Sequence, residues 1–206
     1  MGTEKYILPV TSVIIALILF FSILSIYNKK LFMVLLLHPY SIFRNQEYYR
    51  LITSDLVHIS FPHLFINVAI LYVFGTELES KLDSLSENGP LYMFIIHFSS
   101  MLFGNIYSSL KNRKDYGYSS AGASGSILGC TFSYIILAPD SQLLTVPFLG
   151  TVSNYWGVLL YILIMNYFRM KSKDDAVNHD LHFLGVLGGI AATAVLLPNE
   201  VLEFFN

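Results

Sequence analysis

Six long apolar segments run through this chain of 206 residues and limit the folds that it can adopt. A helix needs about 20 mostly apolar residues to span the hydrocarbon core of a bilayer. Lipid cannot satisfy backbone hydrogen-bonding groups, so spanning segments of this kind must be helical. We therefore expect an all-α membrane protein, a bundle of six transmembrane helices without a sheet. The predicted helices are Ile7–Tyr27, His63–Leu78, Leu91–Leu110, Ala121–Ala138, Pro147–Phe168 and Leu181–Leu197.

The overall composition also places the chain among membrane proteins. Hydrophobic residues make up 54% of it and charged residues only 13%, with a mean hydropathy of +0.58. Soluble domains carry about 25% charged residues. The formal net charge of −2 gives no basic excess, so no nucleic-acid partner is expected. The single cysteine, Cys130, excludes a disulfide framework within the chain.

The connections between the segments differ in character. The first, residues 28–62, is too apolar for a solvated loop and too interrupted to span, so we expect short helices lying in the membrane interface. The first apolar segment is too long for a signal peptide, and Lys29-Lys30 follows it where a cleavage site would lie. We predict one domain over residues 1–206. The remaining predicted connections are Glu79–Pro90, Lys111–Ser120, Pro139–Val146 and Arg169–Asp180.

A serine opens the fourth segment within the small-residue run SSAGASGSILG, residues 119–129. Polar residues in membrane segments are costly, which makes Ser124 a candidate for function. Gly125 and Gly129 follow it, four residues apart, and such a pair lets another helix approach closely.

A histidine opens the sixth segment in a similar way. His182 is followed by Gly185 and Gly189, again four residues apart. Packing the two glycine grooves together would bring Ser124 and His182 into contact range. The alternative interpretation is glycine packing between helices, with two incidental polar residues.

The second segment begins with His63 and Asn67, whose spacing of four residues places both on one helix face. A hydrogen bond between helices would explain this pair equally well. In a six-helix chain, however, the second, fourth and sixth helices run in the same direction. His63, Ser124 and His182 would then lie near the same membrane face, at a similar shallow depth.

These residue types in one water-reachable space indicate nucleophilic catalysis. A serine hydroxyl becomes a good nucleophile when a neighbouring base takes its proton, and neutral imidazole is such a base. Attack on a peptide carbonyl creates an oxyanion that needs preorganised donors. The backbone N–H of Ser124 can supply one such donor, and His63 and Asn67 can supply others. Asp180 lies on a different helix face from His182, so we expect a Ser-His dyad.

Taken together, these motifs resemble the rhomboid intramembrane serine proteases over nearly the whole chain. The family's tryptophan-arginine pair is similar to Tyr49-Arg50, and the glutamate that ends its second helix is similar to Glu79. The motif G-x-S-G is present as Gly122–Gly125, H-x-x-x-N as His63–Asn67, and H-x-x-G-x-x-x-G as His182–Gly189.

The resemblance implies a site sunk below the membrane surface that cleaves transmembrane substrates near a membrane boundary. It implies Ser124 as nucleophile, His182 as general base, and His63 with Asn67 in the oxyanion pocket. It implies helix 5 as a lateral gate and no metal or organic cofactor. The compact length is most similar to bacterial members of the family, which would place the protein in a bacterial inner membrane.

Two departures from the family pattern concern the neighbours of the reacting groups. The family often has an aromatic residue four positions after the serine, packed on the histidine, whereas this chain has Leu128. His182 must therefore be held by something else. Tyr49 replaces the tryptophan, a mild change at an interfacial position. Neither departure removes a reacting group.

The distribution of positive charge conflicts with the orientation that the resemblance implies. The rule that cytoplasmic loops are positive would put the active-site face in the cytoplasm, whereas the family usually has that face outside and the N-terminus inside. We predict the family orientation. On the side opposite to the predicted site, the positively charged residues are Lys5 and Lys81. The ten on the active-site side are Lys29, Lys30, Arg44, Arg50, Lys111, Arg113, Lys114, Arg169, Lys171 and Lys173.

Other residues have simpler interpretations. His179 and His182 suggest a metal site, but zinc needs three or four converging ligands, so no metal is predicted. We expect His58 to be interfacial, His97 to be a packing residue, and Arg50 to bond backbone carbonyls of the first loop.

Two other functions compete with proteolysis. One is a non-catalytic binder of membrane proteins, a pseudoprotease. The other is a small transporter, which would have broken midplane helices and inverted repeats that this sequence lacks.

Overall fold

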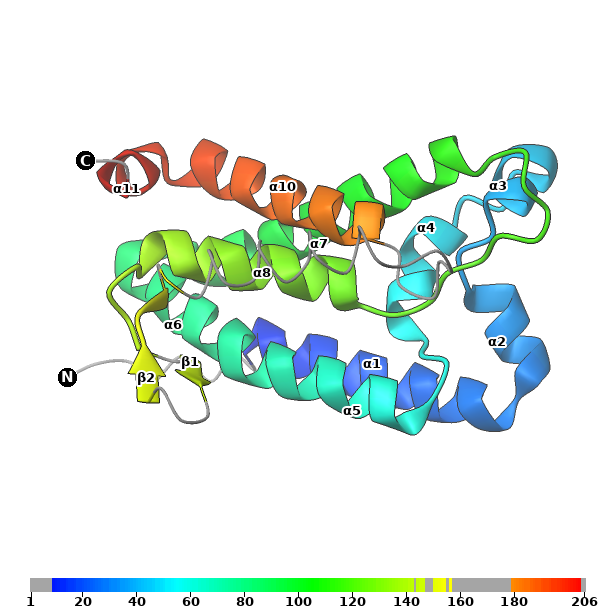
Figure 1. Cartoon of the computed structure of the whole chain (residues 1–206), viewed down its shortest axis with the longest axis horizontal. Helices are drawn as coiled ribbons and strands as arrows, with labels where there is room; N and C mark the ends of the chain where they lie inside the picture. The colour runs from blue at the N-terminus through cyan, green and yellow to red at the C-terminus, as the bar shows by residue number, and fades with distance from the viewer. Residues whose placement is uncertain (1–8, 143, 147–149, 155, 157–178, 205–206) are drawn as a thin grey trace.

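The computed structural model describes residues 9–142, 144–146, 150–154, 156 and 179–204, and these are nearly all helical. The long helices lie side by side, with the short helices of the first loop grouped at one end (Figure 1). The long elements are α1 (Val10–Tyr27), α5 (Phe61–Ile70) with its continuations η2 (Leu71–Gly75) and α6 (Thr76–Leu85), α7 (Gly89–Lys111), α8 (Ser124–Leu137) and α10 (His179–Leu196). The short elements are α2 (Lys29–Leu35), α3 (Pro39–Asn45), α4 (Arg50–Thr53), η1 (Ser54–Leu56), α11 (Pro198–Glu203), β1 (Leu144–Val146) and β2 (Gly150–Val152).

Four of these helical stretches are long and apolar enough to cross a membrane: α1, the continuous run Phe61–Leu85, α7 and α10. The apolar helix α8 is shorter, with 14 residues. Five of the predicted segments are therefore present as helices. The predicted fifth segment, Pro147–Phe168, lies mostly outside the described residues. Its described residues Gly150–Val152 form the strand β2, so the predicted helical start of this segment was wrong.

The second membrane helix is longer than the sequence suggested. It runs to Leu85, seven residues past the predicted end, so part of the predicted loop Glu79–Pro90 is helical. The charges of this stretch suggested a loop, but Leu78 and Leu82 lie on one face and are buried. A π-helical turn, η2, joins the two halves of this helix.

Two further details differ from the prediction. The fourth helix begins at Ser124 rather than Ala121, because the preceding residues form an irregular turn. The bundle also contains one short antiparallel hairpin, in which Leu144 of β1 pairs with Val152 of β2. The helical bundle was predicted correctly, but a bundle without any sheet was not.

The first loop folds into the short helices that its sequence predicted, and Arg50 organises them. Arg50 is buried and donates from Nη1 to the carbonyl oxygens of Met33 and Leu36, each at 2.9 Å. Its Nε donates to Glu47 at 2.5 Å. The predicted role of Arg50, bonding backbone carbonyls of this loop, is confirmed.

At the opposite end of the bundle, Glu79 ties α6 to the start of α1. Its carboxylate accepts from the backbone N–H groups of Val10 at 2.5 Å and Thr11 at 2.9 Å. The first N–H groups of a helix have no partner within the helix, and a negative charge there is favourable. Glu79 therefore caps α1.

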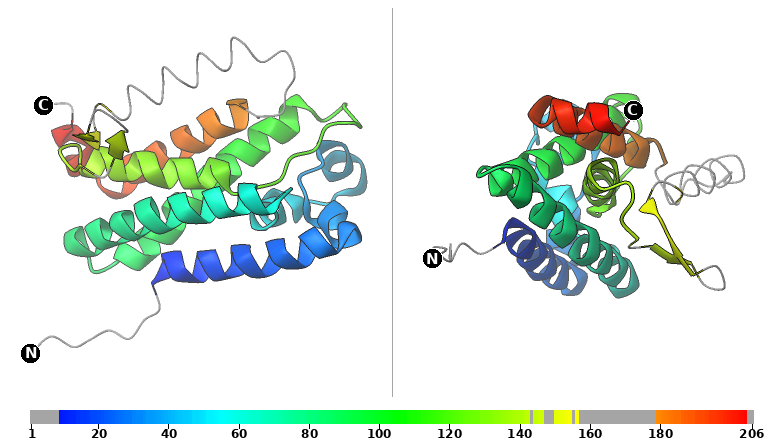
Figure 2. Two further views of the ribbon diagram at one scale, coloured as in Figure 1. Left: turned by 60° about the horizontal axis from the view of Figure 1, so that its bottom comes forward. Right: turned by 90° about the vertical axis from the view of Figure 1, so that its left-hand side faces the viewer.

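Helix α8 occupies the centre of the bundle, with nearly all its residues buried. Viewed end-on, α7, α10 and the run Phe61–Leu85 lie next to it, whereas α1 lies further away (Figure 2). Helix α8 packs closely against α10, where glycines face each other. A Cβ atom on Gly185 would lie 2.5 Å from the Gly125 carbonyl oxygen, and one on Gly189 would lie 2.6 Å from that of Gly129. The predicted packing of the two glycine grooves is present.

Candidate active site

The turn before α8 sets the position of Ser124, the first residue of that helix. Gly122 has φ of +124°, a backbone conformation that side chains other than glycine rarely adopt. A Cβ atom there would also lie 2.7 Å from Cε1 of His63. Glycine is thus required at this position for two reasons, conformation and the close approach of the histidine ring.

Ser124 and His182 meet across the contact between α8 and α10. The Ser124 hydroxyl lies 2.5 Å from Nε2 of His182, and both side chains are half-buried. The contact range predicted from the two glycine pairs is therefore present. A neutral imidazole with its proton on Nδ1 accepts from the hydroxyl at Nε2, the geometry that a general base needs. The catalytic roles of the two residues stay a prediction.

The position four residues after Ser124 is Leu128, so no aromatic ring there can pack on His182. The start of α10, which carries His182, is instead held by other neighbours. Leu181, beside His182, fills the space left by two glycines: Cβ atoms on Gly104 and Gly125 would each lie 2.7 Å from Leu181 atoms. Lys111 at the end of α7 forms an ion pair with Asp180. Packing and charge on α10 therefore replace the ring contact that Leu128 cannot make.

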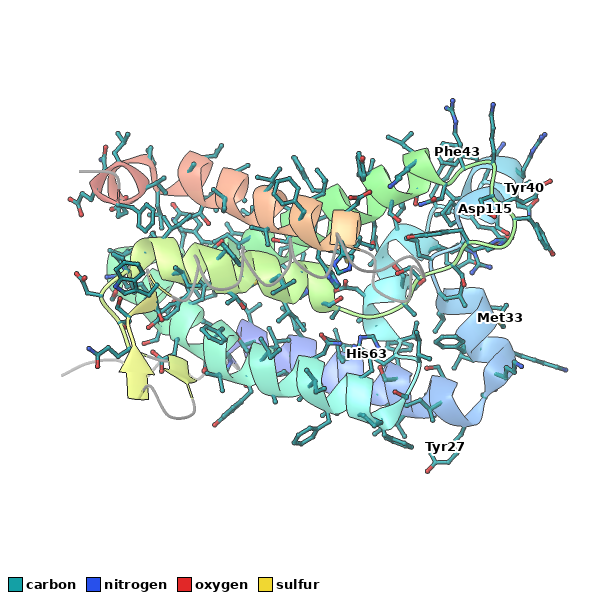
Figure 3. The ribbon with its side chains drawn as sticks, viewed as in Figure 1. Tyr27, Met33, Tyr40, Phe43, His63 and Asp115 are labelled. Carbon is teal, nitrogen blue, oxygen red and sulfur yellow. The ribbon has the colours of Figure 1, made fainter. Side chains whose placement is uncertain are left out.

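A cavity of about 300 Å³ opens beside Ser124 and His182. It is lined by all four predicted site residues, Ser124, His182, His63 and Asn67, and by the chain from Tyr118 to Gly122. His63 lies at the start of α5, between α5 and α8 (Figure 3). The Asn67 amide donates to the His63 carbonyl oxygen at 3.1 Å, which leaves its second amide hydrogen for another acceptor. The structure thus brings together every residue that the sequence proposed for the site.

His58 also belongs to this region, and the prediction that it is interfacial was wrong. Its side chain is fully buried, and its ring packs edge-on against that of His63 with centroids 4.9 Å apart. Nδ1 lies 2.8 Å from the Ser22 hydroxyl, and Nε2 accepts from the Ala123 N–H at 3.4 Å. Burial lowers the pKa of His58 to about 3, so the ring is neutral near pH 7.

His97 is buried, in agreement with its prediction as a packing residue, but it also has polar partners that the sequence did not indicate. Its Nε2 lies 3.4 Å from Oδ2 of Asp55, a residue of η1. Asp55 is itself buried although it comes from the first loop. Sequence reasoning missed Asp55, and only its position just before the H-x-x-x-N segment could have drawn attention to it.

The sequence of this chain is similar to one known protein family. A family model described as a rhomboid domain matches residues 45–199, about three quarters of the chain. The chain belongs to the rhomboid family. The matched range includes the first-loop arginine, the α5 motif, the turn before Ser124 and the α10 motif. Rhomboid proteins are embedded in membranes, in agreement with the apolar helices.

Curated rhomboid relatives are between 26% and 32% identical to the chain over the residues that align with it. The rhomboid protease GluP of Bacillus subtilis (strain 168) is 28% identical over 76% of this chain and 27% of its own length. The putative rhomboid protease YdcA of the same organism is 26% identical over 70% of this chain and 65% of its own. The inactive RHOMBOID-like protein 8 of Arabidopsis thaliana is 32% identical over 43% of this chain and 24% of its own. The chain thus spans less than two thirds of each of these relatives.

Proposed function

We propose that this rhomboid-family protein is an intramembrane serine endopeptidase that works with a Ser124–His182 dyad. The observation that carries the proposal is the 2.5 Å distance between the Ser124 hydroxyl and Nε2 of His182, beside a cavity. Two relatives with protease names, one of them putative, support the same activity. A glycine-packed contact between two incidental polar residues would not require a cavity lined by further donors.

The proposed reaction begins with transfer of the hydroxyl proton. His182 Nε2 takes the proton as Ser124 Oγ attacks the carbonyl carbon of a peptide bond, and the carbonyl oxygen becomes an oxyanion. When the tetrahedral intermediate collapses, the C–N bond breaks and His182 donates its proton to the leaving amine. Water, activated by the same imidazole, then attacks the acyl-serine ester and releases the second product.

The oxyanion would be stabilised by groups on both sides of the cavity. The backbone N–H of Ser124 has no partner within α8, because it belongs to the first turn of that helix. His63 and the free hydrogen of the Asn67 amide line the same cavity. Loss of one such donor typically costs about 2.7–4 kcal/mol of transition-state stabilisation.

The proposed substrates are transmembrane proteins, cut near a membrane boundary. A helical peptide bond is hidden by its own hydrogen bonds, so a substrate must unwind before its carbonyl carbon can meet Ser124. We also propose residence in a bacterial inner membrane, with the active-site face outside. Reporter fusions before Lys5 and after Asn206 test this: the family orientation predicts a cytoplasmic N-terminus, and both termini outside would contradict it.

A non-catalytic binder is the second candidate, because one relative carries the name of an inactive protein. The intact Ser124–His182 contact favours the protease. A fluorophosphonate probe, which labels activated serines, separates the two proposals. It should label the wild-type protein and fail on Ser124→Ala and His182→Ala. Ser133→Ala is a matched control, since this buried serine lies further along the same helix. Labelling that persists in Ser124→Ala would refute the proposed nucleophile.

A further inference from the structure

Two consecutive residues of η1 hold the chain on both sides of Ser124. The carbonyl oxygen of Ser54 accepts from the Gly122 N–H at 2.9 Å, two residues before Ser124. The carboxylate of Asp55 accepts from the Ser126 hydroxyl at 2.6 Å, two residues after it. The turn that presents the nucleophile is therefore fastened at two points to the first loop.

Asp55 is buried, and a buried carboxylate needs compensating partners. His97 on α7 supplies a partner, with its Nε2 3.4 Å from the same carboxylate oxygen. Nδ1 of His97 lies 3.8 Å from the Cys130 sulfur on α8. Asp55 thus links η1, α7 and α8, and ionisable groups kept inside a membrane protein are functional candidates.

The contact with Ser126 places the carboxylate at the first turn of α8. Ser126 Oγ also lies 2.7 Å from the Ala123 carbonyl oxygen, so one hydroxyl proton serves two acceptors. A negative group beside the first turn is favoured by the exposed N–H groups and the dipole of the helix. The bond from Asp55 therefore restrains the turn of helix that carries Ser124.

We propose that Asp55 is a positioning residue for Ser124, an inference that rests on the proposed protease function. Asp55 is not among the residues that line the cavity, and its carboxylate bonds Ser126 rather than Ser124 or His182. It acts through Ser126, keeping the Ser124 hydroxyl within reach of His182 and the Ser124 N–H aimed at the oxyanion. The alternative is a structural role, in which the buried pair stabilises the fold and leaves the geometry of the nucleophile unchanged.

The two roles differ in what they change, so kcat, KM and the rate of fluorophosphonate labelling are compared well below the unfolding midpoint. Ser126→Ala removes the donor of the hydrogen bond between Ser126 and Asp55, and Asp55→Ala removes its acceptor. Because a misplacement of 1 Å can cost about a hundredfold in rate, we expect each to lower kcat and the labelling rate about tenfold or more. KM should stay within about twofold, since no substrate contact is lost.

Two further variants complete the experiment. Asp55→Asn keeps an oxygen acceptor for Ser126 and should restore most of the rate. Ser133→Ala is the matched control, since it is equally buried on α8, donates to the Gly129 carbonyl oxygen at 2.9 Å and accepts from Thr193 at 2.8 Å. It should lose stability without losing kcat.

The inference is overturned if Ser126→Ala keeps the kcat of Ser133→Ala, or if Asp55→Asn is no better than Asp55→Ala. Should Asp55→Ala fail to fold, Ser126→Ala and Asp55→Asn still carry the comparison with Ser133→Ala. Failure of the proposed function has a different signature. Wild type and Ser124→Ala would then be labelled alike, whatever the Asp55 variants do.

Discussion

Nδ1 of His58 lies 2.8 Å from the hydroxyl of Ser22, and this contact determines which ring nitrogen carries the proton. The Ser22 hydroxyl has one hydrogen, which it donates to the Leu56 carbonyl oxygen at 2.8 Å. Ser22 must therefore accept from His58 Nδ1–H. The unprotonated Nε2 then faces the Ala123 N–H, next to Ser124. Helix α1 is in this way connected to the turn before Ser124 through a single neutral imidazole.

This arrangement predicts different effects for two substitutions of His58. Glutamine can place its amide oxygen near the position of Nε2 and accept from the Ala123 N–H, whereas the shorter asparagine reaches only toward Ser22. We expect His58→Gln to keep kcat within about threefold and His58→Asn to lower it about tenfold or more. Cleavage of a transmembrane substrate, measured at equal folded fraction, checks this. Equal rates for the two variants would contradict the bond to Ala123.

The neutral, buried state of His58 also predicts a pH dependence of stability. Its pKa is about 3 in the folded protein, against 6.5 for an ordinary histidine. Between these values the unfolded chain binds a proton that the folded protein excludes, so stability is lost as pH falls below about 6.5. Each pH unit corresponds to about 1.4 kcal/mol.

His58→Gln provides the comparison, because it lacks the titrating ring and leaves all other groups in place. Between pH 7.5 and pH 5, we expect the free energy of unfolding in detergent to fall by about 2 kcal/mol more for wild type than for this variant. Parallel stability curves for the two proteins would show that His58 titrates normally when folded.

The glycine contact between α8 and α10 predicts that even one methyl group at Gly185 separates Ser124 from His182. A Cβ atom there would meet the Gly125 carbonyl oxygen at 2.5 Å, and backbone cannot move aside cheaply. We expect Gly185→Ala to lower fluorophosphonate labelling about a hundredfold, since a shift near 1 Å has that effect. Ala191→Leu, on an exposed position of α10, should label like wild type. Normal labelling of Gly185→Ala would contradict the geometry of the contact.

Replacement of Arg50 tests how the first loop is held together. Its planar guanidinium bonds two carbonyl oxygens and Glu47 at once, and a lysine ammonium does not reproduce that geometry. We expect Arg50→Lys to lower the free energy of unfolding by about 2–3 kcal/mol, since bonds to charged groups contribute about 1.5–3 kcal/mol each. Arg44→Lys, at an exposed arginine over the Tyr40 ring, should change it by less than about 0.5 kcal/mol. Similar losses for both would argue against a special role of Arg50.

Sequence patterns predicted the parts of this fold that depend on the length of apolar segments and on the spacing of glycines. Apolar length located five described helices, and glycines four residues apart indicated that α8 and α10 pack closely enough for Ser124 to meet His182. Arg50 was predicted to bond backbone carbonyls of the first loop, and it does so.

Other features depend on tertiary packing that no local pattern encodes. His58 and Asp55 lie in the first loop, whose sequence predicted short interfacial helices, and both are buried because α1, α7 and α8 pack around them. The charged stretch Glu79–Leu85 resembles a loop, yet it is helical because one of its faces packs on the bundle and Glu79 caps α1. The strands β1 and β2 have only three residues each, too few for an alternating apolar and polar pattern to identify them.

The most direct test of the account is incubation of the purified protein in lipid vesicles with a single-pass transmembrane substrate. Mass spectrometry would locate the cut for wild type, Ser124→Ala, His182→Ala and the control Ser133→Ala. A protease with a Ser124–His182 dyad should make one cut near the membrane boundary as wild type and as Ser133→Ala, and none as Ser124→Ala or His182→Ala. The same cut made by Ser124→Ala, or a substrate bound but left whole by the wild-type protein, would contradict it.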